Sequence, residues 1–174
     1  GSVLDRLPPS DAEVLSAAFN QPKLTKEMYD SFYPCYIHGK PDMYFTFALN
    51  HVGGLLLKWY RDNLGLPEAR DAAKTGSDPY EAILEKVPEG GPSRLMVLPH
   101  FNGSGTPTCD VNSKGAIVGL TVASTRHDIV RAILESQTYE LKINMDAMNA
   151  AGVPVSDLIA AGGGAKSPLW LQIR

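Results

Sequence analysis

The sequence is short of cysteine, of long hydrophobic runs and of excess charge of either sign. Its two cysteines, Cys35 and Cys109, form no Cys-x-x-Cys pair, which argues against a disulfide scaffold and against a cysteine zinc site. No apolar run approaches the ~18 residues of a membrane span. The formal net charge of −3 argues against a surface built to bind nucleic-acid phosphates. The N-terminus shows no signal-peptide pattern, so we expect a cytoplasmic protein.

What remains is the composition of an ordinary globular protein. Of the 174 residues, 44% are hydrophobic and 20% are charged, and a chain of this length corresponds to about one domain. Gly1 and Ser2 resemble a cloning scar, and the chain stops at Arg174 within a helical pattern. We therefore expect residues 1–174 to be one domain of a longer protein, truncated at both ends.

The hydrophobic pattern predicts strands alternating with helices after a hairpin, which is typical of an α/β domain with a mixed sheet. In chain order we expect a helix over 11–19, strands over 32–38 and 43–49, a helix over 51–64, strands over 95–98 and 116–120, a helix over 126–151, a strand over 158–161 and a helix that opens at 167–168. The polar residues 66–93, with two short helical pieces, are predicted to be a surface insertion.

Capping residues identify the starts of three of these helices. Ser10 with Glu13, and Thr125 with Asp128, have the spacing and residue types of a capping box. Asn50 is expected to cap the helix over 51–64, because its side chain can accept a hydrogen bond from an unpaired N–H of the first turn.

The strongest local feature is the glycine-rich turn Gly162–Gly164, between the apolar residues 158–161 and a helix start at Ser167. Glycine lets a backbone approach a ligand closely, and a helix N-terminus presents unpaired N–H groups to an anion. The spacing is not that of a P-loop, because Ala165 stands where that motif has glycine, nor that of the dinucleotide fingerprint. Two interpretations stay open: a nucleotide contact, or only a tight turn between a strand and a helix.

The other candidate sites carry weaker signals. The second glycine loop, over 103–107, lacks the spacing of a nucleophile elbow and is predicted to be a surface turn. The four histidines are scattered, with none four residues from another, so no zinc site is predicted. Glu135, which follows two apolar residues of the long helix, is expected to be partly buried and hydrogen bonded. Spacing alone therefore predicts an α/β domain with a candidate nucleotide turn and indicates no reaction.

Four stretches of the chain also carry a family resemblance. They are GGLLLKWYRD at 53–62, Leu-Pro at 98–99 with Thr106, Pro107 and Asp110, the stretch 115–135 that begins GAIVGL, and AGGGAKSPLW at 161–170. In this order they resemble the C-terminal domain of the FGGY carbohydrate kinases, and within that family the xylulose-kinase-like branch. One departure is GSGTP at 103–107, where xylulose-kinase-like members usually have Gly-Glu-Arg-Thr-Pro.

The resemblance implies an actin-like, ribonuclease-H-like fold, with a mixed β-sheet flanked by helices, and ATP as a ligand. It places the adenosine against Gly163 and Gly164, and the ribose and phosphates near a facing wall that follows the strand over 116–120. Carried over in full, the nucleotide-binding residues are Gly119, Leu120, Thr121, Gly163, Gly164, Ala165 and Ser167.

The same resemblance implies an ATP-dependent kinase that uses Mg²⁺ and phosphorylates a hydroxyl of a pentulose or similar carbohydrate. The aspartate base and most of the sugar site would lie in an N-terminal domain outside this chain, so we expect no catalytic or metal-binding residue here and no kinase activity from these residues alone. Neither nucleic acid nor a membrane is expected as a partner, and an open sheet edge leaves a homodimer as one alternative. The alternative function is a non-catalytic nucleotide-binding or regulatory module of the same fold.

Overall fold

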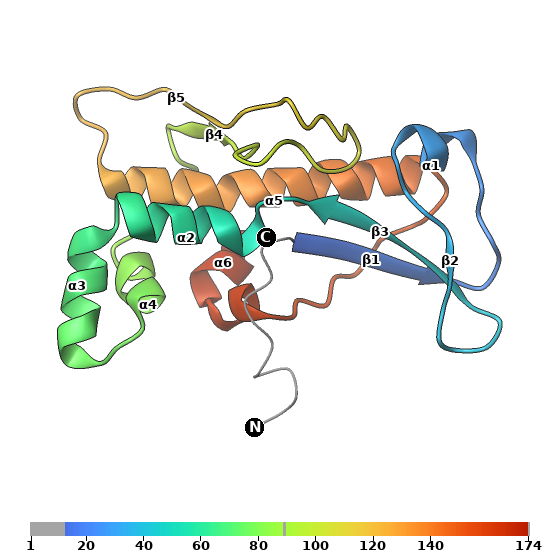
Figure 1. Cartoon of the computed structure of the whole chain (residues 1–174), viewed down its shortest axis with the longest axis horizontal. Helices are drawn as coiled ribbons and strands as arrows, with labels where there is room; N and C mark the ends of the chain where they lie inside the picture. Colours follow the sequence, from blue (N-terminus) through green and yellow to red (C-terminus); the bar gives the residue numbers. More distant parts are fainter. Residues whose placement is uncertain (1–12, 89, 174) are drawn as a thin grey trace.

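One long helix organises the fold. α5 (Arg126–Ala150) has 25 residues, and the other layers pack along its sides (Figure 1). The computed structural model describes residues 13–88 and 90–173. The predicted capping box is confirmed, because Thr125 Oγ1 accepts a hydrogen bond from the Asp128 N–H and the Asp128 carboxylate accepts one from the Thr125 N–H. Beyond the end of the helix, Gly152 adopts a φ of +80°, which suits glycine at this position.

A three-stranded antiparallel sheet packs against the C-terminal half of α5. β1 (Glu13–Phe19), β2 (Tyr36–Ile37) and β3 (Tyr44–Asn50) pair in the order β1-β3-β2. The predicted hairpin between the second and third strands is confirmed, although β2 is shorter than the predicted 32–38. The short helix α1 (Lys26–Asp30) lies in the connection from β1 to β2 and is capped by the Thr25 hydroxyl.

The prediction of a helix over 11–19 is wrong. The segment forms β1, which pairs with β3 along its whole length. Leu15, Ala17 and Phe19 pack into the core and alternate with exposed residues, and this period of two belongs to a strand. Ser10, the first residue of the predicted capping box, lies outside the described residues. Pairing with a strand distant in the sequence therefore overrides the local helical signal.

A helical layer packs beside the N-terminal half of α5. It contains α2 (Gly53–Asn63), α3 (Leu66–Thr75) and α4 (Pro79–Leu84). α2 begins later than predicted, with Val52 as its N-cap, because the Asn50 side chain bonds the Val52 N–H ahead of the helix. The buried Gln137 amide of α5 donates to Gly53 O at 2.9 Å, which ties the two helices together.

Residues 66–93 take part in the core of this structure. Besides forming α3 and α4, they supply Ile83 and Val87 to the buried cluster that also contains Leu56, Tyr60 and Val130. The segment therefore packs as part of the domain, while its status as an insertion relative to other proteins stays a prediction.

A second, two-stranded sheet lies on the other side of α5 (Figure 1). It consists of β4 (Met96–Leu98) and β5 (Ala116–Val118), and both predicted strands are confirmed. Every pair of named strands in the described residues is antiparallel. The structure thus has two antiparallel sheets flanked by helices where the sequence predicted one mixed sheet, since α5 passes between the two.

The strand predicted over 158–161 is also wrong. This stretch has no regular structure, and Ile159 is 98% exposed. An apolar run becomes a strand only where a partner strand satisfies its backbone groups, and no described strand pairs with it. The chain then forms a short 3₁₀ helix, η2 (Gly163–Lys166), and the predicted final helix, α6 (Pro168–Ile173), whose Trp170 is buried.

The loop over 99–115 is held tightly against β3. The Thr106 N–H donates to Leu49 O at 2.9 Å, and Thr106 Oγ1 accepts from the Leu49 N–H at 2.8 Å. Next to this pair, a Cβ on Gly105 would lie 1.7 Å from Leu49 O. No side chain fits at residue 105 unless the loop moves away from the strand.

We expect Gly105→Ala to lower the free energy of unfolding by about 3 kcal/mol, because the added methyl group must push the loop off β3. Gly91→Ala is the matched control, since a Cβ there meets nothing within 4 Å, and it should change stability by less than about 0.5 kcal/mol. Urea unfolding of the two variants measures both values. Equal midpoints for the two variants would contradict the close approach of Gly105 to Leu49.

Candidate functional site

The glycine-rich turn leads from the exposed residues 156–161 into α6. Gly162 has a φ of +87°, a conformation that favours glycine. The next residues form η2, in which the Ala165 N–H donates to Gly162 O at 3.2 Å. Ser167 Oγ then accepts a hydrogen bond from the Trp170 N–H at 3.2 Å. The turn is thus closed by its own backbone and by the serine that begins α6.

Gly163 and Gly164 differ in what surrounds them. A Cβ on Gly164 would lie 2.9 Å from the Trp170 ring, and Trp170 is only 7% exposed. A Cβ on Gly163 would meet nothing within 4 Å, and no positive φ restricts that residue. Packing therefore requires glycine at 164, whereas Gly163 is exposed backbone with open space in front of it.

The second predicted segment, Gly119–Thr121, connects β5 to the turn before α5. Gly119 has a φ of +92°, and a Cβ there would lie 2.9 Å from Arg94 O. Thr121 opens a tight turn in which the Ser124 N–H donates to Thr121 O at 3.0 Å and the Thr121 N–H donates to Ser124 Oγ at 2.9 Å. Leu120 is 55% exposed. The segment is a hydrogen-bonded, solvent-facing turn directly before the N-cap of α5.

The structure does not bring these two segments together. Figure 1 shows β5 and its following turn on one side of α5, and η2 with α6 on the other. Among the described residues, no hydrogen bond joins Gly119–Thr121 to the residues Gly163–Ser167. Within each segment the predicted residues are contiguous and exposed or half-buried. Their action as two walls of one nucleotide site stays a prediction.

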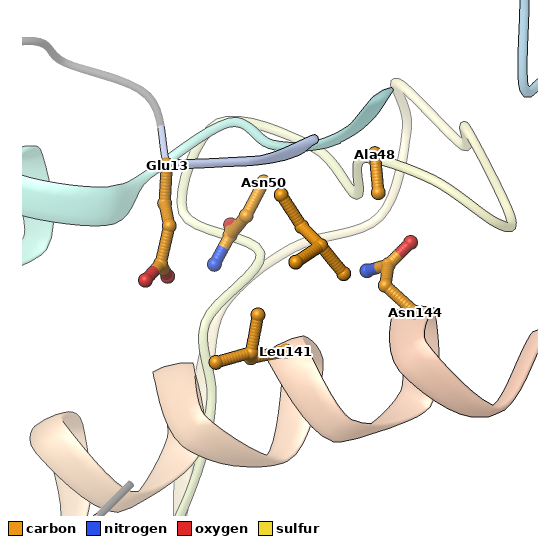
Figure 2. A pocket seen from close by; sticks show the side chains of 6 residues that line it. Glu13, Ala48, Asn50, Leu141 and Asn144 are labelled. Carbon is orange, nitrogen blue, oxygen red and sulfur yellow. The ribbon is translucent and has the colours of Figure 1, made fainter. Parts of the chain in front are cut away.

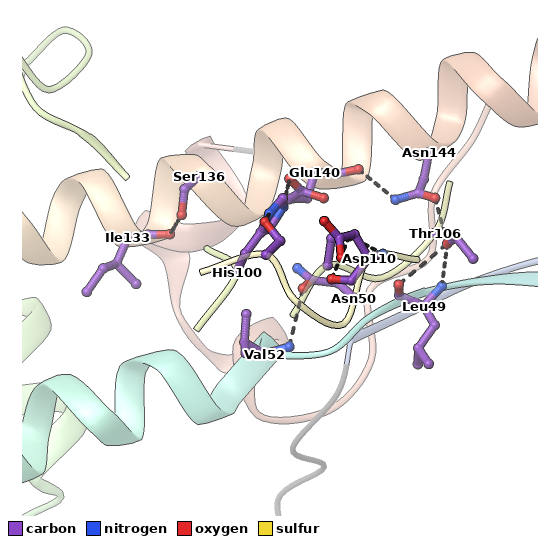
Figure 3. Close-up of polar contacts among 12 residues, drawn as sticks. Leu49, Asn50, Val52, His100, Thr106, Asp110, Ile133, Ser136, Glu140 and Asn144 are labelled. Carbon is purple, nitrogen blue, oxygen red and sulfur yellow. Dashed lines mark hydrogen bonds and ion pairs between the residues drawn. The ribbon is translucent and has the colours of Figure 1, made fainter. Parts of the chain in front are cut away.

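A buried polar network joins the loop over 99–115 to α5 (Figure 3). Asn144 Oδ1 accepts hydrogen bonds from Thr106 Oγ1 at 2.8 Å and from the Tyr33 hydroxyl at 2.9 Å. His100 lies between Ser113 Oγ at 2.7 Å and the Glu140 carboxylate at 3.3 Å. Burial, with a smaller effect of Cys109, raises the pKa of Tyr33 to about 12, so its hydroxyl stays a donor. Because these groups bond one another, the network holds the loop in place.

A small pocket lies between the β1–β3 pair and α5 (Figure 2). Its lining is Glu13, Leu15, Ala48, Asn50, Leu141 and Asn144. None of these is a predicted site residue, and three of the six are apolar. The pocket is therefore separate from the predicted nucleotide-binding residues.

A buried carboxylate anchors the first turn of α5. Glu68 of α3 is 1% exposed, and its Oε1 accepts from Arg126 Nη2 at 2.8 Å, from His127 Nε2 at 3.2 Å and from Lys86 Nζ at 3.4 Å. Burial alone would raise the pKa of Glu68, but the hydrogen bonds from Arg126, from the backbone and from His127 outweigh it and lower the pKa from 4.5 to about 2. Burial, and then the Glu68 charge, raises the pKa of the neighbouring Tyr60 to about 12. Glu68 is thus ionised at neutral pH.

The family follows from a comparison with known proteins. The sequence profile of the FGGY family of carbohydrate kinases, C-terminal domain, matches residues 17–174. The chain belongs to this family.

Individual FGGY relatives are similar over most of this chain. A xylulose kinase of Bacillus subtilis is 29% identical over 137 residues, which cover 79% of this chain and 26% of that protein. A glycerol kinase of Clostridium beijerinckii is 39% identical over 124 residues, which cover 71% of this chain and 23% of that protein. The chain therefore spans about a quarter of the length of the curated relatives it matches.

A solved structure confirms the expected actin-like fold of this FGGY domain. The crystal structure of xylulose kinase from Rhodospirillum rubrum superimposes with a TM-score of 0.74 and 25% identity, over 94% of this chain and 31% of that one. The fold class predicted from the family resemblance is therefore correct, although the strands pair differently from the mixed sheet expected.

The described residues of this FGGY domain contain no group of three His, Cys, Asp or Glu side chains that could hold a metal ion. Mg²⁺ in kinase sites is usually held by one or two carboxylates together with substrate phosphates and water, so it needs no such group. A search of the described helices finds none with the length and apolar character needed to cross a membrane.

Two acidic residues in the described part of this FGGY domain are buried, and only one of them, Glu135, is predicted by the sequence. Glu135 is buried as predicted, and its carboxylate accepts from Arg131 Nε at 2.9 Å and from the Ser93 N–H at 3.0 Å. Glu68 lies in a polar segment and gave no signal, because its partners Arg126 and His127 are more than fifty residues away in the chain. Glu135 could be predicted because two apolar residues precede it on the same helix. Glu68 has no such neighbours in the sequence.

The pKa of Glu68 predicts how stability depends on pH. Because the folded-state pKa is lower than the unfolded one, the ionised carboxylate stabilises the fold above pH 4.5, and that contribution is lost as the pH falls from 4.5 to about 2. We therefore expect the unfolding free energy of the wild type to fall more steeply than that of Glu68→Gln across this window. Urea unfolding at a series of pH values measures both profiles, and parallel profiles would show that Glu68 is not the group responsible.

Proposed function

We propose that this chain is the nucleotide-binding part of an ATP-dependent kinase that phosphorylates a hydroxyl of a pentulose or a similar carbohydrate. One observation carries the proposal: Gly163 presents bare backbone to open space, in the turn that the family resemblance assigns to adenosine. Adenine needs a flat surface that a ligand can approach closely, and glycine provides one. Membership in the FGGY family supports a carbohydrate as the acceptor.

In this proposal the turn serves as the floor of the adenosine site. Gly163 makes the contact, Gly164 lets the turn rest on Trp170, and Ala165 and Ser167 hold the shape of the turn. Bound ATP supplies the phosphoryl group that is transferred. Gly119, Leu120 and Thr121 would face the phosphate side of the ligand, although their segment lies on the other side of α5 from the glycine-rich turn in this structure (Figure 1). Mg²⁺ would bind mainly to the phosphates of ATP and water and would neutralise the phosphate charge.

The acceptor would bind mainly to the part of the longer protein that is outside this chain. Phosphoryl transfer depends on positioning and charge stabilisation, so this domain would orient the nucleotide and an aspartate elsewhere would accept the proton of the sugar hydroxyl. A pentulose is our proposed acceptor class, supported by the xylulose kinases among the relatives and solved structures. The cytoplasm, where ATP is available, is the proposed location.

The experiment is a calorimetric titration of ATP and ADP into the 174-residue chain. We expect weak binding, near millimolar, or about −4 kcal/mol. Gly163→Val should weaken it at least about tenfold, because the side chain occupies the space in front of the turn without touching the protein. Gly164→Val is unsuitable, since its side chain would strike Trp170 and disturb the fold itself.

Gly39→Val is the matched control for Gly163→Val. A Cβ on Gly39 would also meet nothing within 4 Å, and Gly39 has no positive φ. Unlike Gly163, it lies in the β2–β3 turn, away from the predicted site. We expect this variant to bind ATP like the wild type. If Gly163→Val also bound like the wild type, adenosine would not lie against the turn, and a wild type without any nucleotide binding would remove the proposed half-site from this chain.

A further inference from the structure

The charge cluster around Glu68 joins α3 to the first turn of α5. Arg126 and His127 are the first two residues of α5, and both donate to one oxygen of Glu68. Lys86, which follows α4, adds a third and longer contact at 3.4 Å. The carboxylate is 1% exposed, whereas the side chains of Lys86, Arg126 and His127 are partly or largely exposed. The negative charge is thus the buried centre of the cluster.

The position of the cluster is unusual for a helix start. The N-terminus of a helix carries partial positive charge, so basic side chains are unfavourable there. α5 nevertheless opens with Arg126 and His127, and two carboxylates compensate, that of Glu68 and that of the capping residue Asp128. Without Glu68, the first turn would hold two basic residues with one acidic residue beside them.

This first turn is directly connected to the predicted phosphate-side wall. Thr121 and Ser124 bond each other within one turn, and Thr125 is the N-cap of α5. Only four residues separate Thr121 from Arg126. The other end of the segment follows β5 at Gly119, where a Cβ would lie 2.9 Å from Arg94 O, which leaves no room for a side chain. The wall is therefore supported at one end by β5 and at the other by the turn that Glu68 anchors.

We propose that Glu68 is a positioning residue: its carboxylate holds the first turn of α5 in place and thereby orders the Thr121–Ser124 turn for ligand contact. The ligand part of this inference rests on the proposed function, whereas the ordering part does not. Glu68 touches no ligand itself and acts through Arg126 and His127.

Glu135 offers a matched control on the same helix. It is also a buried carboxylate, it is also bonded to an arginine, and Glu135→Gln removes the same charge. Its partners are Arg131, which lies beyond the first turn of α5, and the Ser93 N–H, which lies in the segment before β4. A general loss of stability would affect both variants, whereas loss of positioning would affect only Glu68→Gln.

The first experiment measures hydrogen exchange of the Thr121 and Ser124 amides by NMR in the 174-residue chain. Glu68→Gln should speed their exchange about tenfold, and Glu135→Gln less than about twofold. Glu68→Asp, which keeps the charge, should restore most of the protection. Unchanged exchange in Glu68→Gln, or equal acceleration in both Gln variants, would overturn the proposal.

A second variant keeps the test decisive if Glu68→Gln does not fold. Arg126→Met removes the shortest contact from a side chain that is 43% exposed, so the core keeps its buried residues. This variant should also speed hydrogen exchange of the Thr121 and Ser124 amides. Exchange at wild-type rates in Arg126→Met would count against the proposal that Glu68 orders this turn through Arg126.

The second experiment measures nucleotide binding by the same variants. Glu68→Gln should weaken ATP binding about fivefold and leave adenosine binding within about twofold, because only the phosphate-side wall is disturbed. Equal losses for ATP and adenosine would show a structural role alone and overturn the ligand part. If the wild type binds no nucleotide, the proposed function fails, and the exchange experiment still decides the role of Glu68.

Discussion

The burial of α5 is the constraint on which the rest of the structure depends. A helix of 25 residues cannot stay in water with Val130, Ile133 and Met148 on its surface, and each of these side chains is fully buried. Two separate clusters accomplish this, one with α2 and the segment over 66–93, and the other with β1 and β3. The helix is therefore the shared wall of both clusters, which explains why the two sheets lie on different sides of it.

The buried face of α5 also contains polar residues, and their hydrogen bonds decide which neighbours fit. Gln137 bonds Gly53 at the start of α2, and Asn144 bonds Thr106 and Tyr33. Leaving the Gln137 N–H or the Asn144 oxygen unpaired would cost about 1–3 kcal/mol, so a neighbour with a matching polar group is favoured at each. These contacts position the start of α2 and the loop over 99–115 relative to the helix. The apolar contacts stabilise the domain, and the polar ones select one arrangement of its layers.

Two carboxylates connect α5 to the segment over 66–93, one from each side of the contact. Glu68 binds the first turn from α3, and Glu135 reaches the Ser93 N–H from within the helix. The functional consequence concerns the turn before α5, which leads from β5 to the first helical residue. A segment that resembles a polar surface piece in the sequence thus supports the part of the chain nearest to the predicted phosphate site. The glycine-rich turn depends on a different support, the Trp170 ring beneath Gly164.

The sequence by itself determined the features that arise within a few residues. The capping box of Thr125 and Asp128, the β2–β3 hairpin, the glycine-rich turn and the family motifs were all predicted, because each depends on neighbours in the chain. The tertiary structure decided the rest. β1 is a strand because β3 lies beside it, and residues 158–161 have no strand because no described strand pairs with them. Glu68 is buried where it meets Arg126 and His127 at the first turn of α5. Pairing and burial depend on residues far apart in the chain, and no local pattern records them.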